Sequence, residues 1–190
     1  MASHYDFALF LLRTDKDTIL LLLHVDDVII TGDDLNGIQE LKNFLSQQFE
    51  MKDLGHLSYV LSFDITHFID GFYITQAKYA SELLSRAGLT DSKTVDTPVE
   101  LNAHLTPIGG NPLSNPSLYR RLVGSLGYLT VTRPDISYAV HQVSQYLSAP
   151  RSTPYAAVLR ILRYLKGTLF HGLFYFAQFP LVLCAFSDAD

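Results

Sequence analysis

The stretch TILLLLHVDDVIITG, residues 18–32, organises the chain. Residues 19–23 and 28–31 are short apolar runs, and short apolar runs bounded by turn residues are typical of buried strands. Between the two runs stand His24, Val25, Asp26 and Asp27. The pattern predicts a strand, a tight turn that carries two adjacent aspartates, and a second strand.

Two interpretations of the aspartates are open at this point. Neighbouring carboxylates repel each other where apolar strands exclude solvent, and a divalent cation relieves that repulsion. Mg²⁺ is typically held by one or two carboxylates plus substrate phosphates, which is the arrangement that two-metal phosphoryl transfer requires. Asp is also one of the commonest turn residues, because its side chain bonds its own backbone. The stretch alone fits a metal site and a structural turn equally well.

Composition places the chain among globular proteins. It has 190 residues, of which 48% are hydrophobic and 17% charged, enough apolar mass for a core. The single cysteine, Cys184, excludes an internal disulfide framework and a multi-cysteine zinc site. The N-terminal residues lack a signal-peptide pattern, and the run 19–23 is too short to span a bilayer. We therefore expect an intracellular protein with no membrane partner.

Charge is distributed unevenly along the chain. Residues 1–100 hold sixteen of the nineteen acids and seven of the fourteen bases, a net charge of −9, whereas residues 101–190 carry +4. Such asymmetry indicates either a polyanionic partner for the basic half or a solvated helix face. The basic half contains Arg120, Arg121, Arg133, Arg151, Arg160, Arg163 and Lys166.

The first half of the chain reads β-β-β-α-β-β-α. Residues 5–13 predict a strand that completes a three-stranded antiparallel meander with the central hairpin. An amphipathic helix should follow to about Phe49, with Asp33 or Asp34 as its N-cap rather than as a metal ligand. Residues 57–66 and 72–75 predict two strands joined by a turn at Asp70 and Gly71. Asp64 is either a solvent-facing strand residue or a third carboxylate.

The second half is predominantly helical. Residues 76–87 predict a helix closed by Gly88, and the proline- and glycine-rich stretch 89–116 marks the main boundary. Further helices are expected over 119–130, from 134 to before 150, and over 154–166, followed by strands 173–176 and 181–186. Gly124 and Gly127 suggest a close backbone approach, and Gly167 a helix cap.

Several blocks together resemble a known family. HVDDVIITGDD resembles the hairpin Y-V-D-D-hydrophobic-I-I-x-G, and FEMKDLGHLSYVLSFDI resembles F-x-M-K-D-L-G-x-L-x-Y-F-L-G-I-E-I. ITQAKYASELLSRAGLTDSKTVDTP, YRRLVGSLGYLTVTRPDISYAV and VLRILRYLKGT resemble three further blocks. In this order and at these separations, they are similar to the reverse transcriptase of copia-type LTR retrotransposons over nearly the whole chain.

The resemblance implies an α+β fold in four parts. Residues 1–75 would form a partial polymerase palm, an antiparallel sheet with packed helices. Residues 76–105 would be thumb-like, and residues 106–170 a helical connection. Residues 171–190 would hold the first strands of a truncated ribonuclease H-like domain, with Asp188 as its first carboxylate.

The resemblance also implies site residues and partners. Asp26 and Asp27 would be the catalytic, metal-binding carboxylates for Mg²⁺ or Mn²⁺, and His24 and Val25 would lie near the primer end and the nucleotide. The partners would be an RNA template, an RNA/DNA primer–template duplex and deoxynucleotides. The side chains expected to touch the nucleic-acid backbone are Arg120, Arg121, Arg133, Arg160, Arg163 and Lys166.

Three departures from the family pattern shape the expected activity. His24 replaces a Tyr, and Ser62 replaces a Gly, which would crowd a close backbone approach. The family's first palm carboxylate lies on an earlier strand that these residues do not include. We therefore expect a fragment that is inactive alone, unless missing polyprotein segments join it. The alternatives are a non-catalytic nucleic-acid-binding module that uses residues 117–167, or a relic without function.

Overall fold

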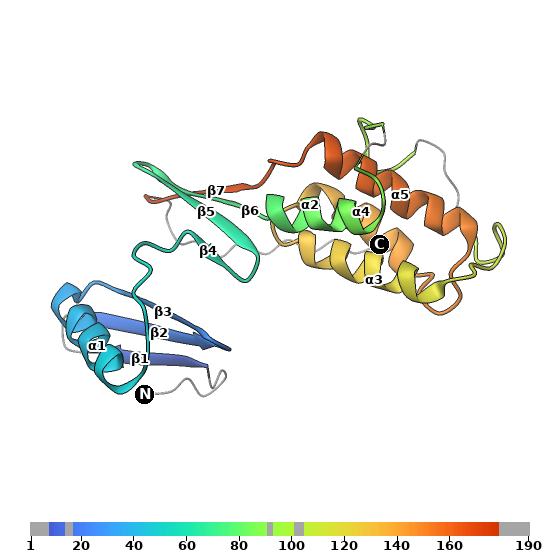
Figure 1. The fold of residues 1–190 in the computed structure, drawn as a ribbon. Helices are drawn as coiled ribbons and strands as arrows, with labels where there is room; N and C mark the ends of the chain where they lie inside the picture. Colours follow the sequence, from blue (N-terminus) through green and yellow to red (C-terminus); the bar gives the residue numbers. More distant parts are fainter. Residues whose placement is uncertain (1–7, 14–16, 91–92, 101–104, 179–190) are drawn as a thin grey trace, which may run out of the picture. The chain divides into compact units, whose positions relative to one another are not determined.

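A computed structural model describes residues 8–13, 17–90, 93–100 and 105–178. The chain divides into two compact units, residues 1–60 and 61–190 (Figure 1). Within the described residues, no helix has the length and apolar character needed to cross a membrane.

The first unit is a small antiparallel sheet with one helix. Strands β1 (Leu9–Arg13), β2 (Thr18–His24) and β3 (Asp27–Gly32) lie in the order β1-β2-β3, which confirms the predicted meander. Helix α1 (Leu35–Gln48) follows, and a two-residue strand, β4 (Tyr59–Val60), ends the unit. Of the two predicted caps, the structure selects Asp34, whose carboxylate accepts a hydrogen bond from the Gly37 amide at 2.8 Å.

Helix α1 covers one face of this sheet. A Cβ on Gly37 would lie 2.7 Å from Cδ1 of Ile19, so Ile19 points toward α1. Because side chains alternate along a strand, Leu20, Leu22 and His24 lie on the opposite face. No residue of α1 is buried, so the sheet is only lightly packed.

The second unit begins with a hairpin. Strand β5 (Phe63–Phe68) pairs with β6 (Gly71–Thr75), and β6 pairs with β7 (Leu173–Phe176) on its other edge, all antiparallel. The turn lies at residues 69–70, one position before the predicted pair. Gly71 has another role, since a Cβ there would lie 2.0 Å from the Tyr175 carbonyl oxygen. This glycine lets β7 approach β6.

Helices form the rest of the second unit. They are α2 (Ala77–Arg86), α3 (Pro116–Leu129), the short 3₁₀ helix η1 (Pro134–Ile136), α4 (Ser137–Ser144) and α5 (Ser152–Gly167). Their inward faces build one core, as the periodicity predicts. Fully buried members include Leu126 on α3, Val143 on α4 and Leu162 on α5.

The structure corrects two expectations about glycines. A Cβ on Gly124 or Gly127 would meet nothing within 4 Å, so neither glycine serves a close approach inside the protein. Gly167 is the last residue of α5, and Thr168 is the C-cap. Gly88 does close α2 as predicted, with a positive φ of 68°. The predicted strand 181–186 and Asp188 lie outside the described residues.

Candidate functional site

The aspartate pair sits at the tip of the β2–β3 hairpin. His24 is paired with Asp27 across the two strands, which leaves Val25 and Asp26 as the two loop residues. Val25 has a φ of +52° and is 89% exposed. A positive φ at the first of two loop residues is typical of a type II′ turn, where glycine is preferred. A β-branched residue therefore holds a strained backbone conformation at this tip.

Both carboxylates are exposed to solvent. The expectation that the flanking strands withhold solvent from them is therefore wrong for the described residues. Asp27 lies opposite His24 in the register, and such partners share a face of the sheet. Asp27 therefore projects from the face that α1 leaves uncovered, with Asp26 beside it in the turn.

The other carboxylates considered in the sequence have structural partners. Asp33 accepts a hydrogen bond from the Thr18 amide at 2.6 Å, at the far end of the hairpin. Asp64, in the second unit, forms an ion pair with Lys78 at 2.8 Å and is only partly exposed. Among the described residues, no group of three or more His, Cys, Asp or Glu side chains could hold a metal ion.

Several of the basic side chains tie the helical unit together. Arg120 donates hydrogen bonds to the carbonyls of Leu147 and Ser148, just beyond α4. Arg151 donates to the carbonyls of Ile108 and Gly110, at 2.8 and 2.6 Å. These guanidinium groups pair with backbone oxygens of residues that lie outside helices and strands.

Two further cations hold the segment before α3 against α5. Arg160 donates to Oγ1 of Thr97 at 2.9 Å, and Lys166 donates to the Thr90 carbonyl. By contrast, Arg121 and Arg163 form no hydrogen bond or ion pair with any described residue, and Arg121 is exposed. These two guanidinium groups are the ones available for an external anion.

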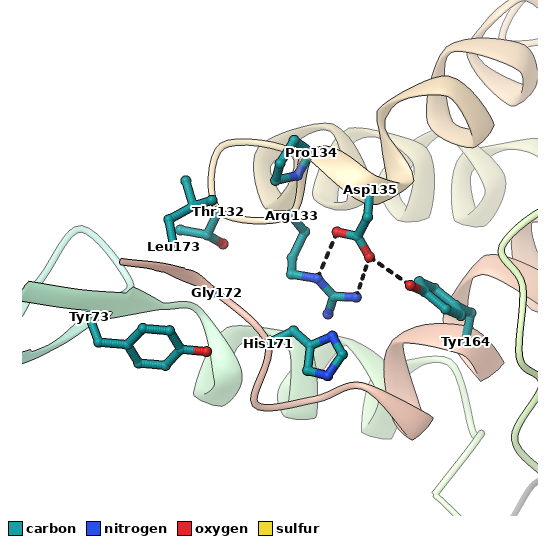
Figure 2. A pocket seen from close by; sticks show the side chains of 9 residues that line it. All are labelled: Tyr73, Thr132, Arg133, Pro134, Asp135, Tyr164, His171, Gly172 and Leu173. Carbon is teal, nitrogen blue, oxygen red and sulfur yellow. Dashed lines mark hydrogen bonds and ion pairs between the residues drawn. The ribbon is translucent and has the colours of Figure 1, made fainter. Parts of the chain in front are cut away.

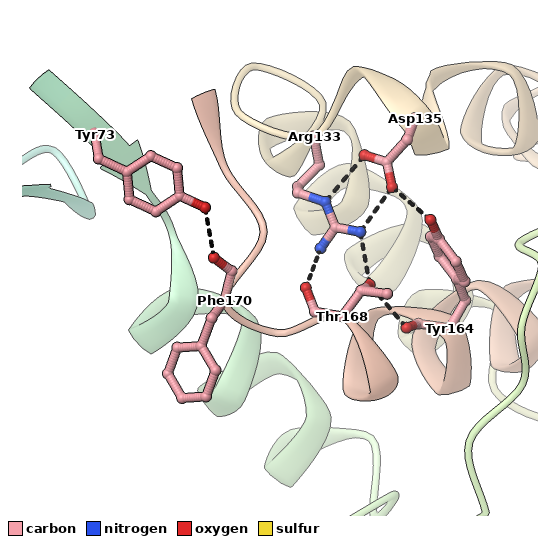
Figure 3. A network of polar contacts seen from close by, with 6 residues as sticks. All are labelled: Tyr73, Arg133, Asp135, Tyr164, Thr168 and Phe170. Atoms are coloured by element: carbon pink, nitrogen blue, oxygen red, sulfur yellow. Dashed lines mark hydrogen bonds and ion pairs between the residues drawn. The ribbon is translucent and has the colours of Figure 1, made fainter. Parts of the chain in front are cut away.

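Arg133 is the centre of a polar network that the sequence reasoning missed (Figure 3). The side chain is nearly inaccessible, at 4% exposure, and forms two hydrogen bonds with Asp135. Burial would raise the pKa of the Asp135 carboxyl, but hydrogen bonds from Arg133 and Tyr164 outweigh it and lower that pKa. Arg133 also donates to the carbonyl and the hydroxyl of Thr168. The spacing Arg-Pro-Asp signals the pair with Asp135, but Thr168, 35 positions away, leaves no local signal.

A shallow cleft of about 320 Å³ opens beside this network (Figure 2). The ring of His171 lies across the cleft from the guanidinium of Arg133. Asp135 also lines the cleft, and its negative charge opposes the entry of an anion. Arg133 is therefore used for contacts within the protein, and the cleft is not suited to binding a phosphate.

Comparison with known proteins identifies the family. The profile of the family described as "Reverse transcriptase (RNA-dependent DNA polymerase)" matches residues 3–101, just over half of the chain. The chain belongs to the reverse transcriptase family. The match includes the aspartate hairpin, the β5–β6 hairpin and α2. The resemblance to copia-type retrotransposon enzymes is therefore confirmed.

The relatives of this reverse transcriptase chain include polyproteins of transposons. It is 40% identical over 185 residues to the Retrovirus-related Pol polyprotein from transposon RE1 of Arabidopsis thaliana, and 37% identical to that from transposon TNT 1-94 of Nicotiana tabacum. It spans 13% and 14% of the length of those polyproteins. It is 41% identical to the Uncharacterized mitochondrial protein AtMg00810 of Arabidopsis thaliana, covering 70% of that protein and 90% of itself. No solved structure matches the chain.

Family membership adds a divalent metal to what is expected of the site. Reverse transcriptases generally use divalent metals, and a pair of adjacent carboxylates is suited to Mg²⁺. The hairpin tip has the right donor chemistry for such an ion, but the described residues supply only part of a metal-binding set.

Proposed function

We propose that the chain is the segment of a retrotransposon reverse transcriptase that carries the aspartate hairpin of the polymerase site. Asp26 acts as a metal-binding carboxylate and Asp27 as its electrostatic neighbour. His24 and Val25 lie beside the primer end and the incoming nucleotide. The single observation that carries this proposal is the exposed two-carboxylate tip, built on a strained turn.

The structure supports Asp26 and Asp27 as ligands for one side of a metal site. Mg²⁺ bound there would neutralise charge on the phosphates and orient them for transfer. The family pattern places a further carboxylate on an earlier strand. Strand β3 lies at the edge of the described sheet, so another strand can pair with it and bring that carboxylate beside Asp27.

It follows that these 190 residues alone do not extend a primer. Two-metal catalysis requires carboxylates from two strands around the reacting phosphate, and the described residues contain no cluster of three metal-binding side chains. Asp64 does not fill the gap in this proposal, because Lys78 already neutralises it.

The nucleic-acid surface that we propose is smaller than the charge count suggests. Arg120 and Arg121 are both exposed cations of α3, but only Arg121 forms no hydrogen bond or ion pair with a described residue. Gly124, one turn further on, leaves open space where a duplex backbone can approach. Arg163 is the second available cation. Arg120, Arg133, Arg160 and Lys166 are left out, because each already bonds within the protein.

The four sequence-derived parts remain proposals. Residues 1–75 would be the partial palm, 76–105 thumb-like, 106–170 the connection, and 171–190 the start of a ribonuclease H-like domain with Asp188. The last of these parts begins with strand β7. Strand β7 extends the β5–β6 hairpin into a sheet, so residues 173–176 also contribute structure to the preceding parts.

The first experiment is primer extension on an RNA template. We expect no product from the 190-residue chain with Mg²⁺ or Mn²⁺, and none from Asp26→Ala. Extension that Asp26→Ala abolishes would show that the site is complete within this chain and would contradict the proposed inactivity.

A chimera provides the positive test. Residues 3–101 replace the matching segment of an active RE1-type polymerase. The chimera should extend primers and lose that activity with Asp26→Ala. Asp70→Asn, in the exposed β5–β6 turn, is the matched control and should retain activity. A soluble, folded chimera in which Asp26→Ala extends primers normally would remove Asp26 from the site.

The second candidate function is nucleic-acid binding without catalysis. It is favoured by Arg121 and Arg163, the two predicted contact residues that form no hydrogen bond or ion pair with a described residue. Each neutralised phosphate releases counterions, so affinity for a duplex should fall steeply with salt. Arg121→Gln should reduce the slope of log affinity against log salt by about 1, whereas Arg120→Gln should leave it unchanged. Absent or salt-independent binding would rule out this module and leave the relic as the remaining alternative.

A further inference from the structure

We propose that Arg133 is a positioning residue that locks the β5–β6–β7 sheet onto the helical core, so that the two move as one body. The lock itself follows from contacts within the second unit. Its use, holding the hairpin and α3 in fixed relation around a duplex, rests on the proposed function.

Arg133 connects two segments that are far apart in the sequence. It lies in the turn between α3 and η1, where Nε and Nη2 donate to the Asp135 carboxylate at 2.9 and 2.7 Å. Nη1 donates to the Thr168 carbonyl at 2.9 Å, and Nη2 to the Thr168 hydroxyl at 2.7 Å. Figure 3 shows the guanidinium between the helical turn and the end of α5. One side chain thus fixes the point where the chain leaves α5 for β7.

Neighbouring hydrogen bonds connect this point to the sheet. Thr132 donates from its hydroxyl to Oε1 of Gln76 at 2.8 Å, and both residues are buried. Gln76 is the N-cap of α2 and directly follows β6. On the other side, the hydroxyl of Tyr73 on β6 donates to the Phe170 carbonyl at 2.8 Å. Hydrogen bonds therefore hold both connections between the sheet and the helices, the one from β6 to α2 and the one from α5 to β7.

The backbone at the start of β7 is held equally closely. A Cβ on Gly172 would lie 2.2 Å from the Ile74 carbonyl oxygen. Any larger residue would push β7 away from β6. Because Thr168 is only four residues earlier, displacement of the α5 end from Arg133 would be transmitted directly to this contact.

A guanidinium suits this position better than any other side chain. Its planar fork can bond a carboxylate with two nitrogens and still donate elsewhere, as Arg133 does. Tyr164 donates to Oδ2 of Asp135 at 2.9 Å, and its ring centroid lies 5.7 Å from Cζ of Arg133. A lysine has three donors on one atom and would not reach all these oxygens in the same geometry.

The test measures a distance distribution between two spin labels. In a Cys184→Ser background, Ile69→Cys labels the 97% exposed tip of the β5–β6 hairpin and Ala156→Cys labels the exposed side of α5. The parent protein should give one narrow distribution. Arg133→Met and Arg133→Lys should lose that single narrow distribution, because the sheet can then tilt against the helices.

The matched control is Arg120→Met. It also removes an arginine that bonds two backbone carbonyls, but at the end of α4 rather than beside the sheet. This variant should keep the narrow distribution even if it lowers the melting temperature. If Arg133→Met gives the parental distribution, or if Arg120→Met broadens it equally, the lock is refuted. Where Arg133→Met does not fold, Thr132→Val and Asp135→Asn replace it, with the same two outcomes.

Duplex binding separates the lock from its proposed use. With a primer–template duplex, Arg133→Met should weaken affinity and leave the salt slope unchanged, since Arg133 touches no phosphate, whereas Arg121→Gln should reduce the slope. A reduced slope in Arg133→Met would make it a contact residue and contradict the positioning role. If the parent does not bind duplex, the proposed function fails, while the spin-label result still decides whether the lock exists.

Discussion

The two units of the chain differ sharply in how they bury apolar side chains. In the described part of the first unit, Ile19 and Val60 are the buried hydrophobic residues, and α1 buries none. The second unit contains a continuous core formed by α2 to α5 with their connections. The predicted catalytic aspartates thus stand on the weakly packed unit, and the unit with the buried core contains helices α2 to α5. The proposed chemistry and the main core therefore lie in different parts of this chain.

The reason lies in the two faces of the β1–β3 sheet. Helix α1 lies over one face, and the opposite face presents Leu9, Leu11, Leu20, Leu22 and Ile29, none of which is fully buried. Apolar surface left in contact with water contributes little to folding. The helices α2 to α5 of the second unit have no comparable deficit, because their apolar stripes face one another in a buried core.

Truncating one leucine in each unit tests this contrast most strongly. Leu126→Ala, in the fully buried core, should lower the free energy of unfolding by about 2–5 kcal/mol. Leu22→Ala, on the uncovered face, should cost less than about 1 kcal/mol. Denaturant titration with hydrogen exchange of peptides from each unit measures both. Equal losses would show that the first unit has a core of its own under solution conditions.

The Arg133–Asp135 pair lies in the second unit and should make the stability of that unit depend on pH. Hydrogen bonds hold the pKa of Asp135 below its ordinary 3.8. Its charged form therefore stabilises the second unit above that pH, and the stabilisation is lost as the pH falls through the lowered pKa. Asp135→Asn should destabilise the unit at neutral pH, by less than Leu126→Ala, and flatten the acid limb of its stability curve. Acid titration of the melting temperature measures this, and an acid limb as steep as the parent's would contradict it.

Tyr119 should make the stability of the second unit depend on pH in the alkaline range. Its hydroxyl donates to the Val143 carbonyl at 2.6 Å inside the core, and burial raises its pKa from 10.0 to about 12. Tyr119→Phe should cost about 1 kcal/mol at neutral pH. Because the unfolded tyrosine ionises before the folded one, parent stability should fall as the pH rises from about 10 to 12. The stability of Tyr119→Phe should fall less than that of the parent over this pH range. Identical curves of stability against pH would argue against the burial of this hydroxyl.

The smallest expected effects come from two turns, one in each unit. Val25 and Ser62 have φ values of +52° and +63°, which glycine adopts without the strain of a Cβ. Val25→Gly and Ser62→Gly should each stabilise their own unit by about 0.5–1 kcal/mol. Thermal unfolding with unit-specific peptides measures the change. A destabilised Ser62→Gly would mean that the serine side chain compensates for the backbone strain.

Local patterns in the sequence predicted most of the elements, but the single strand expected over 57–66 is wrong. The structure has β4 and β5 there, separated by a turn at Leu61 and Ser62, whose φ values are +49° and +63°. The spacing of apolar residues placed α3 and α5, and the short runs around Asp26 placed the central hairpin. These features depend on neighbours within a few positions, so the sequence displays them directly. The backbone conformation of Ser62 could not be predicted. A positive φ leaves no trace in the sequence when a residue other than glycine occupies the position.

The use of the basic residues could not be read in the same way. Arg133 binds Thr168, 35 positions away, and Arg120 binds Leu147, 27 positions away. Such bonds depend on how helices come together after folding. An arginine that binds a carbonyl and an arginine that is available to a phosphate are the same residue type, so the charge count of the basic half cannot distinguish the two.

The separate core of the second unit has a consequence for how such genes decay. The position of a break in a gene decides whether a foldable product survives. A break near residue 60 would leave the helical unit with its whole core, whereas the aspartate hairpin would be left as a sheet with one bare face. We therefore expect heritable remnants of this region to keep the helical part intact longer than the catalytic hairpin.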